Sequence, residues 1–292
     1  MLRFISVRVG FVRSLLWHRY GFFWSQLLAD GDADVAYAEP EEAAHFLDDD
    51  EVREIPGRGF RAAAAEALAL ASCDVIIAPS LNAGYMGSKG SAQDPFVNDL
   101  PSTLAAILPR LPRVLPVPTS LSGPGLDTLA VSLLSLVNPS PGMVRRIWQT
   151  HQANAHPPSL PLPPQPGPSE SVIGVVGQPW NLGDSVMDSL REPNAQYLRA
   201  DQFEPSSLRE EGWRIDERLA PTDAEALGAV RRMTRRSDVA SFLFVMDSDA
   251  GADAWLERRV MEEARKPVAR IELPDVAFSF RTEGTSGTSG AT

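Results

Sequence analysis

The fold of this chain is decided by residues 62–79, which read Ala62-Ala-Ala-Ala-Glu-Ala-Leu-Ala-Leu-Ala-Ser-Cys-Asp-Val-Ile-Ile-Ala-Pro79. The alanine-rich part, residues 62–71, predicts a helix. Residues 74–79 then form a short run with apolar side chains on successive positions, as a strand covered on both faces requires. A helix followed directly by such a strand is typical of a parallel sheet with crossover helices.

The same alternation runs through the rest of the chain. It predicts further strands at residues 4–12, 35–38, 114–117, 172–176, 197–200, 241–246 and 268–273. It predicts further helices at residues 15–29, 126–137, 143–153, 223–236 and 253–264. The pattern as a whole predicts an α/β protein built from two doubly wound, flavodoxin-like parallel sheets.

A proline-rich segment divides the two predicted sheets. Residues 157–168 hold seven prolines in twelve positions and show no apolar periodicity, which favours an extended spacer. We therefore predict an N-terminal α/β domain at 1–154 that ends in a helical pair, a linker at 155–170 and a smaller α/β domain at 171–276. Residues 277–292 are rich in Gly, Ser and Thr and are predicted to form a disordered tail.

The composition excludes several classes of protein. The formal net charge of −11 repels phosphate backbones and anionic lipid headgroups, so we expect neither a nucleic-acid nor a membrane partner. Charged residues interrupt every long apolar stretch near the N-terminus, and no signal-peptide cleavage pattern follows it, so a cytoplasmic location is expected. The single cysteine, Cys73, excludes disulfides within the chain and any metal site that needs three or four of its own thiolates.

Candidate ligand-binding residues follow the predicted strands, because open parallel sheets bind ligands at the carboxyl ends of their strands. The candidate cleft between the domains is lined by Arg13, Ser14, Asn98, Gln178, Trp180, Asn181, Asp184 and Asp247. Arg13 is the cation of this set, so it is the candidate partner for a small anionic ligand, with Trp180 as a flat apolar surface beside it. The alternative is that Arg13 forms an internal ion pair with Asp184 or Asp247.

Other motifs carry no catalytic prediction. No glycine-rich dinucleotide fingerprint or phosphate-binding loop occurs, and the four histidines show no metal-ligand spacing. The segment from Asp247 to Asp253 resembles a calcium loop, but Arg258 stands where the bidentate glutamate is needed, which favours an acidic helix start. Cys73 is expected to be a buried thiol. No catalytic residue and no metal ligand is therefore assigned.

Four segments in collinear order resemble one known family. They are Val9-Gly-Phe-Val-Arg-Ser-Leu15 with the aromatic run that follows it, Asp94-Pro-Phe-Val-Asn-Asp-Leu-Pro101, Ile173-Gly-Val-Val-Gly-Gln-Pro-Trp-Asn-Leu-Gly-Asp184, and Ala250-Gly-Ala-Asp-Ala-Trp255 leading to Lys266-Pro-Val-Ala-Arg-Ile-Glu-Leu273. Together they resemble motifs of the 2-hydroxyacyl-CoA dehydratase and benzoyl-CoA reductase superfamily, over about residues 5–275. The resemblance implies two flavodoxin-like domains, a [4Fe–4S] cluster held by three cysteines at their junction, and electrons delivered by an ATP-dependent activator.

The cysteines that this resemblance requires are missing. Asp94 and Ala250 occupy two of their positions, and the third falls near Ile55 and Pro56. We therefore expect a bacterial dehydratase-like pseudoenzyme without an iron–sulfur cluster, acting as a non-redox binding, assembly or regulatory subunit. The alternatives are a subunit that supplies an acyl-CoA pocket to a cluster-bearing partner, and a small-molecule binding protein that uses the cleft. A cluster-bearing homologous subunit or the activator ATPase is the expected partner.

Overall fold

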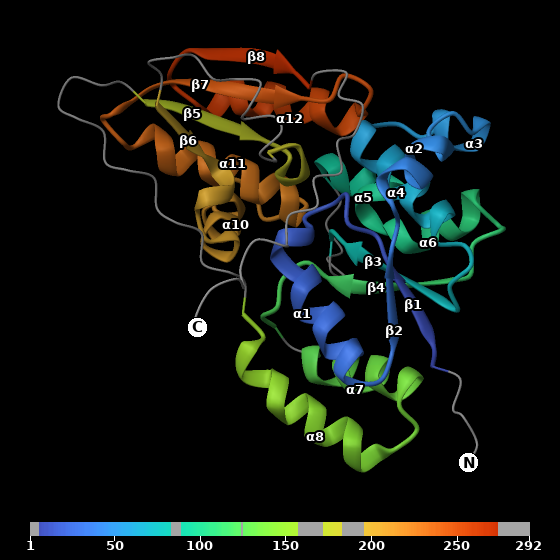
Figure 1. Ribbon diagram of the computed structural model, residues 1–292. Helices are drawn as coiled ribbons and strands as arrows, with labels where there is room; N and C mark the ends of the chain where they lie inside the picture. The colour runs from blue at the N-terminus through green and yellow to red at the C-terminus, as the bar shows by residue number, and fades with distance from the viewer. Residues whose placement is uncertain (1–5, 83–88, 124, 157–171, 183–195, 274–292) are drawn as a thin grey trace, which may run out of the picture.

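The computed structural model describes residues 6–82, 89–123, 125–156, 172–182 and 196–273. Its strands form two separate four-stranded sheets, and in both every neighbouring pair is parallel. The predicted α/β class with two parallel-sheet domains is confirmed. We call the described residues 6–156 the first unit and 172–273 the second unit (Figure 1).

The sheet of the first unit has the strand order β2-β1-β3-β4. Its strands are β1 (Arg8–Phe11), β2 (Asp34–Tyr37), β3 (Val75–Ser80) and β4 (Arg113–Pro118). Each lies within, or one residue beyond, the apolar run that predicted it. The strand predicted at 4–12 is shorter in the structure. Among the described residues it begins at Arg8 and ends at Phe11. Central β3 is buried over Ile76, Ile77 and Ala78, which is why its run reads as uninterrupted hydrophobic sequence.

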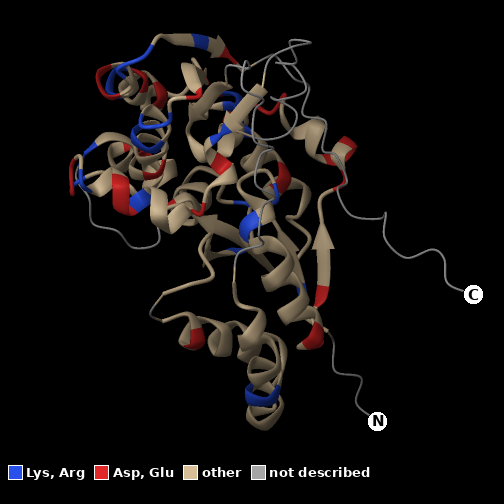
Figure 2. Ribbon diagram, turned by 90° about the vertical axis from the view of Figure 1, so that its left-hand side faces the viewer, with Lys and Arg blue, Asp and Glu red and all other residues tan. Residues whose placement is uncertain are grey.

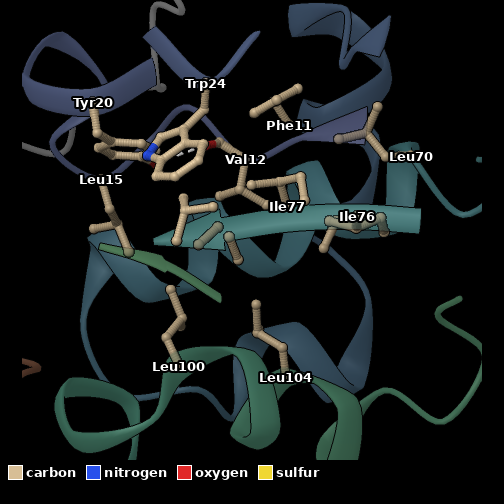
Figure 3. Close-up of a cluster of buried hydrophobic side chains, with 14 of the residues drawn as sticks. Phe11, Val12, Leu15, Tyr20, Trp24, Leu70, Ile76, Ile77, Leu100 and Leu104 are labelled. Atoms are coloured by element: carbon tan, nitrogen blue, oxygen red, sulfur yellow. Dashed lines mark hydrogen bonds between the residues drawn. The ribbon is translucent and has the colours of Figure 1, made fainter. Parts of the chain in front are cut away.

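Helices cover both faces of the first sheet. They are α1 (Trp17–Asp30), α2 (Pro40–Phe46), α3 (Asp50–Arg53), α4 (Arg58–Ala69), α5 (Pro95–Asn98), α6 (Leu100–Ile107), α7 (Leu126–Val137) and α8 (Pro141–His151). Figure 3 shows Tyr20 and Trp24 of α1 on one side of β3, and Leu100 and Leu104 of α6 on the other. The pair α7 and α8 packs against α1 outside the sheet, as expected.

The second unit repeats the strand order of the first. Its sheet, β6-β5-β7-β8, contains β5 (Val172–Gly177), β6 (Gln196–Arg199), β7 (Val239–Met246) and β8 (Val268–Glu272). Its helices are α10 (Pro205–Trp213), α11 (Pro221–Thr234) and α12 (Gly251–Glu263). It has a hydrophobic core of its own, separate from that of the first unit. In chain order, the strands of each sheet are therefore arranged 2-1-3-4, as in flavodoxin-like folds.

The predicted domain limits stay predictions. Nearly all of the linker at 155–170 and the whole tail at 277–292 lie outside the described residues. None of the helices in the described ranges has the length and apolar character needed to cross a membrane.

Candidate functional site

The two units meet where the helices begin and the strands end. Helices that follow parallel strands start at the carboxyl edge of the sheet, so the first turns of α1, α4, α11 and α12 point toward this edge. Residues at the starts of α1, α4 and α11 contact the opposite unit through the hydrogen bonds and ion pairs described below. We call this boundary between the units the seam.

Arg13 and Ser14 lie at the end of β1 and bind within the first unit. Their backbone N–H groups donate to Glu66 Oε2 at 2.6 and 2.9 Å. The Arg13 guanidinium donates to the carbonyl of Ala38 and stacks 5.0 Å over the ring of Tyr37. Burial raises the pKa of Glu66 to about 7. The two candidate residues therefore belong to an internal network around a buried carboxyl.

Asp247, one of the two predicted ion-pair partners of Arg13, pairs with Arg58 instead. Asp247 lies after β7, and its carboxylate accepts from the backbone N–H of Arg58 at 2.5 Å, while the Arg58 side chain approaches at 3.9 Å. Asp247 thus binds the N-terminus of α4, a helix of the other unit, where the helix dipole favours a negative charge. Asp184, the other predicted partner, lies outside the described residues.

Gln178 joins the two units through a buried amide. Its Nε2 donates to Ser91 Oγ at 2.9 Å and to Asp223 Oδ1 at 2.8 Å. The backbone N–H of Ser91 donates to Asp223 Oδ2 at 2.8 Å. Burial raises the pKa of Asp223 to about 6, against the lowering effect of these donors. At Gly90 the approach is so close that an added Cβ would fall 2.2 Å from Asp223 Oδ2, so glycine is required there.

A second buried carboxyl lies beside Asn181 and Asp247. Asp253 Oδ2 accepts from Asn181 Nδ2 at 2.8 Å and from the backbone N–H of Asp247 at 2.7 Å. Burial raises the pKa of Asp253 to about 8, and the neighbouring charges of Asp247 and Asp223 raise it further. Asp253 is in the first turn of α12, as expected for an acidic helix start, but the N-cap position belongs to Ala250.

Asn98 lies apart from these networks. It ends the short helix α5, is exposed, and accepts from Asn82 Nδ2 at 3.1 Å. The structure thus brings together Gln178, Asn181 and Asp247, and it places Arg13 and Ser14 in a neighbouring network of the first unit.

Three aromatic rings meet at the seam beside these polar groups. The rings of Phe60 and Phe96 stack at 5.3 Å, and the ring of Trp180 lies 5.5 Å from that of Phe60. Trp180 therefore packs on the aromatic side chains of the first unit, whereas the Arg13 guanidinium stacks on Tyr37. We call Phe60, Phe96 and Trp180 the aromatic cluster.

The three positions expected to hold cysteines lie around the aromatic cluster. Ala250 is buried, and a Cβ added to Gly57 would lie 3.3 Å from the Cβ of Ala250 and 3.2 Å from the Phe60 ring. Ile55, two residues before Gly57, is also buried. Asp94 accepts from the backbone N–H of Phe96 at 2.9 Å and caps α5. Segments almost two hundred residues apart in sequence therefore converge here.

Cys73 lies at the other edge of the first sheet. It precedes β3, and a Cβ added to Gly10 would lie 3.1 Å from its Sγ. Burial raises the pKa of the thiol, which disfavours the reactive thiolate. This cysteine belongs to the core of the first unit, as expected.

The comparisons with known proteins add no functional assignment. No protein-family model matches the chain, and no curated protein sequence matches it. Among solved structures, the glycosyltransferase SnogD from Streptomyces nogalater is 14% identical over 91% of this chain and 82% of its own, with a TM-score of 0.22. The apo form of the dinucleotide-forming acetyl-coenzyme A synthetase 1 from Ca. Korarchaeum cryptofilum is 12% identical over 92% of this chain and 57% of its own, also with a TM-score of 0.22. Likenesses this weak carry no argument.

Proposed function

We propose that the chain is a 2-hydroxyacyl-CoA dehydratase-like protein that acts as a non-redox binding, assembly or regulatory subunit. The observation that supports this proposal is the convergence of three motif positions, represented by Ile55, Asp94 and Ala250, around the aromatic cluster. A scaffold shared with this family would bring these positions together in this way.

The residues at these positions do not fit an iron–sulfur cluster. Such clusters select soft thiolate ligands, whereas these positions carry a carboxylate and two aliphatic side chains. The Asp94 carboxylate already accepts from the N–H of Phe96, and the methyl of Ala250 packs close to Gly57. The aromatic cluster packs against the same segments. We therefore derive no redox step for this chain.

A role in assembly is favoured over ligand binding by how the candidate residues are used. Gln178 and Asp247 form hydrogen bonds across the seam, whereas Asn181 bonds Asp253 within the second unit and Arg13 holds contacts within the first unit. These hydrogen bonds of the candidate side chains are thus made to other groups of the protein. The partner expected for such a subunit is a cluster-bearing homologous chain or the activator ATPase.

The proposal is tested by purifying the tagged full-length chain anaerobically from its own cells. We expect a fixed ratio to a homologous partner, with the iron remaining on the partner after the chains are separated. The Cys73→Ser variant serves as the matched control and should behave identically, because this thiol is buried away from the seam.

Two outcomes would contradict the proposal. Stoichiometric iron on the separated chain would restore a redox role. A chain that has no partner and binds a small organic anion saturably would favour the alternative of a small-molecule binding protein.

A further inference from the structure

Ion pairs across the seam are sorted by sign. Among the described residues, four ion pairs join a residue of the first unit to one of the second: Arg19 with Glu225, Arg58 with Asp247, Arg61 with Asp249, and Lys89 with Asp216. In each of these pairs the first unit supplies the cation. Figure 2 shows charges of both signs crowded in the upper part of the molecule, where the second unit lies, and few on α7 and α8 below it.

The pair between Arg19 and Glu225 is the most buried of these contacts. The two guanidinium nitrogens of Arg19 donate to the two oxygens of Glu225 at 3.1 and 2.6 Å, and both side chains are more than nine-tenths buried. Arg209 approaches Glu225 at 3.8 Å from within the second unit. A bidentate pair of this geometry fixes the relative orientation of the two helices that carry it.

Behind these pairs the second unit presents three buried carboxyl groups. They are Asp223 on α11, Asp247 after β7 and Asp253 on α12, and each is at most 2% exposed. The first unit provides hydrogen-bond donors to two of them: the N–H of Arg58 donates to Asp247, and the N–H and hydroxyl of Ser91 donate to Asp223. From their own unit they receive the amides of Gln178 and Asn181.

We infer that the seam is a pH-dependent electrostatic contact. The sorted charges hold the two units in one arrangement, and the units separate when the group of three buried carboxyls gains a further negative charge. Among the three carboxyls, Asp223 and Asp247 receive donors directly from the first unit, whereas Asp253 receives donors only from Asn181 and the Asp247 backbone. Its second oxygen, Oδ1, is buried without a hydrogen-bond partner. Asp253 is therefore the group whose ionisation is compensated least.

The direction of the pH effect follows from these surroundings. Asp253 has a pKa of about 8, so it is neutral at pH 7 and ionises as the pH rises through that value. The charges that face it are the carboxylates of Asp247 and Asp223, and the Arg58 side chain pairs with Asp247. Ionisation thus places like charges together in a buried site, and separating the units admits water to them. This inference does not depend on the proposed function.

The experiment uses the full chain with a dye pair, one dye on each unit. Ser132→Cys on α7 and Met261→Cys on α12 place the dyes at exposed positions, and Cys73 is left in place because it is buried. We expect the transfer efficiency to fall between pH 7 and pH 9 with a midpoint near 8, while the far-ultraviolet circular dichroism stays constant. In the Asp253→Asn variant, which keeps the size and one acceptor oxygen, this transition should be absent.

Asp238→Asn is the matched control, because Asp238 pairs with Arg236 within the second unit, just before β7 and away from the seam. It should keep the transition. The inference is overturned by constant transfer efficiency in the unsubstituted protein across this pH range, a result that needs no variant to fold. It is also overturned if Asp253→Asn folds and shows the same midpoint.

Discussion

The two units share a strand order but bring opposite chemistry to the seam. The first unit contributes arginines, a lysine and backbone N–H groups, whereas the second contributes carboxylates. The winding of the sheet decides where these residues lie, and the residue types decide what they do there. The difference implies that the second unit depends on the first, because two of its buried acids, Asp223 and Asp247, accept hydrogen bonds from across the seam.

The largest effect is expected when the buried pair is broken. Arg19→Ala leaves Glu225 buried with only the longer contact to Arg209, so we expect a loss of about 3 kcal/mol in the free energy of unfolding. Chemical denaturation followed by circular dichroism measures it. Lys89→Ala is the matched control, since Lys89 is 41% exposed and Asp216 keeps Arg218, and it should cost under ~1 kcal/mol. Equal losses in the two variants would remove the distinction between buried and exposed pairs.

The second effect concerns a buried acid of the first unit. Burial raises the pKa of Glu66 from 4.5 to about 7. Between pH 4.5 and pH 7, Glu66 is therefore protonated in the folded protein and ionised in the unfolded chain. Stability from this group is therefore full below pH 4.5 and is lost as the pH rises through 7. We expect Glu66→Gln to gain roughly 3 kcal/mol relative to the unsubstituted protein between pH 4.5 and pH 7.5.

This prediction is checked by urea unfolding of both proteins at several pH values. Glu51→Gln, which replaces an exposed carboxyl of the same unit, provides the reference. Its difference in unfolding free energy from the unsubstituted protein should not change with pH. A flat difference for Glu66→Gln as well would show that its burial does not govern its ionisation.

The smallest effect is expected at Asp94. Its carboxylate caps α5 by accepting from Phe96, so Asp94→Ala should cost about 1 kcal/mol. Asp94→Asn keeps the acceptor oxygen and should cost only a few tenths. A thermal unfolding series separates the two variants. If Asp94→Ala is neutral, capping does not explain why a carboxylate stands at this position.

Much of the fold was predictable because buried parallel strands read as continuous apolar runs. Five helices of the described ranges, α2, α3, α5, α6 and α10, were not predicted. Four of them begin with an acidic residue that is followed within two positions by a proline, at Glu39-Pro40, Asp94-Pro95, Asp99-Leu100-Pro101 and Glu204-Pro205. This is an ordinary helix-start signal. This signal is present in the sequence, but the pattern of apolar residues alone does not reveal it.

The site was predictable only where residues follow strands. Gln178, Asn181 and Asp247 were found in this way, since the carboxyl edge of a parallel sheet is a local property of the sequence. Ser91, Asp223 and Arg58 were missed because their role depends on how the two units dock, and docking leaves no spacing pattern along the chain. Asp253 was expected as a helix-start acid, whereas its burial beside Asp247 depends on the tertiary fold.

The most direct measurement is the iron bound per chain after anaerobic reconstitution with iron and sulfide. We expect none on the unsubstituted protein and stoichiometric iron on a variant that carries Ile55→Cys, Asp94→Cys and Ala250→Cys together. A control with Ser132→Cys in place of Ala250→Cys should bind none, because α7 lies outside the first sheet. Iron on the unsubstituted protein, or an empty triple variant that folds, would contradict the account of a dehydratase-like scaffold that has lost its cluster.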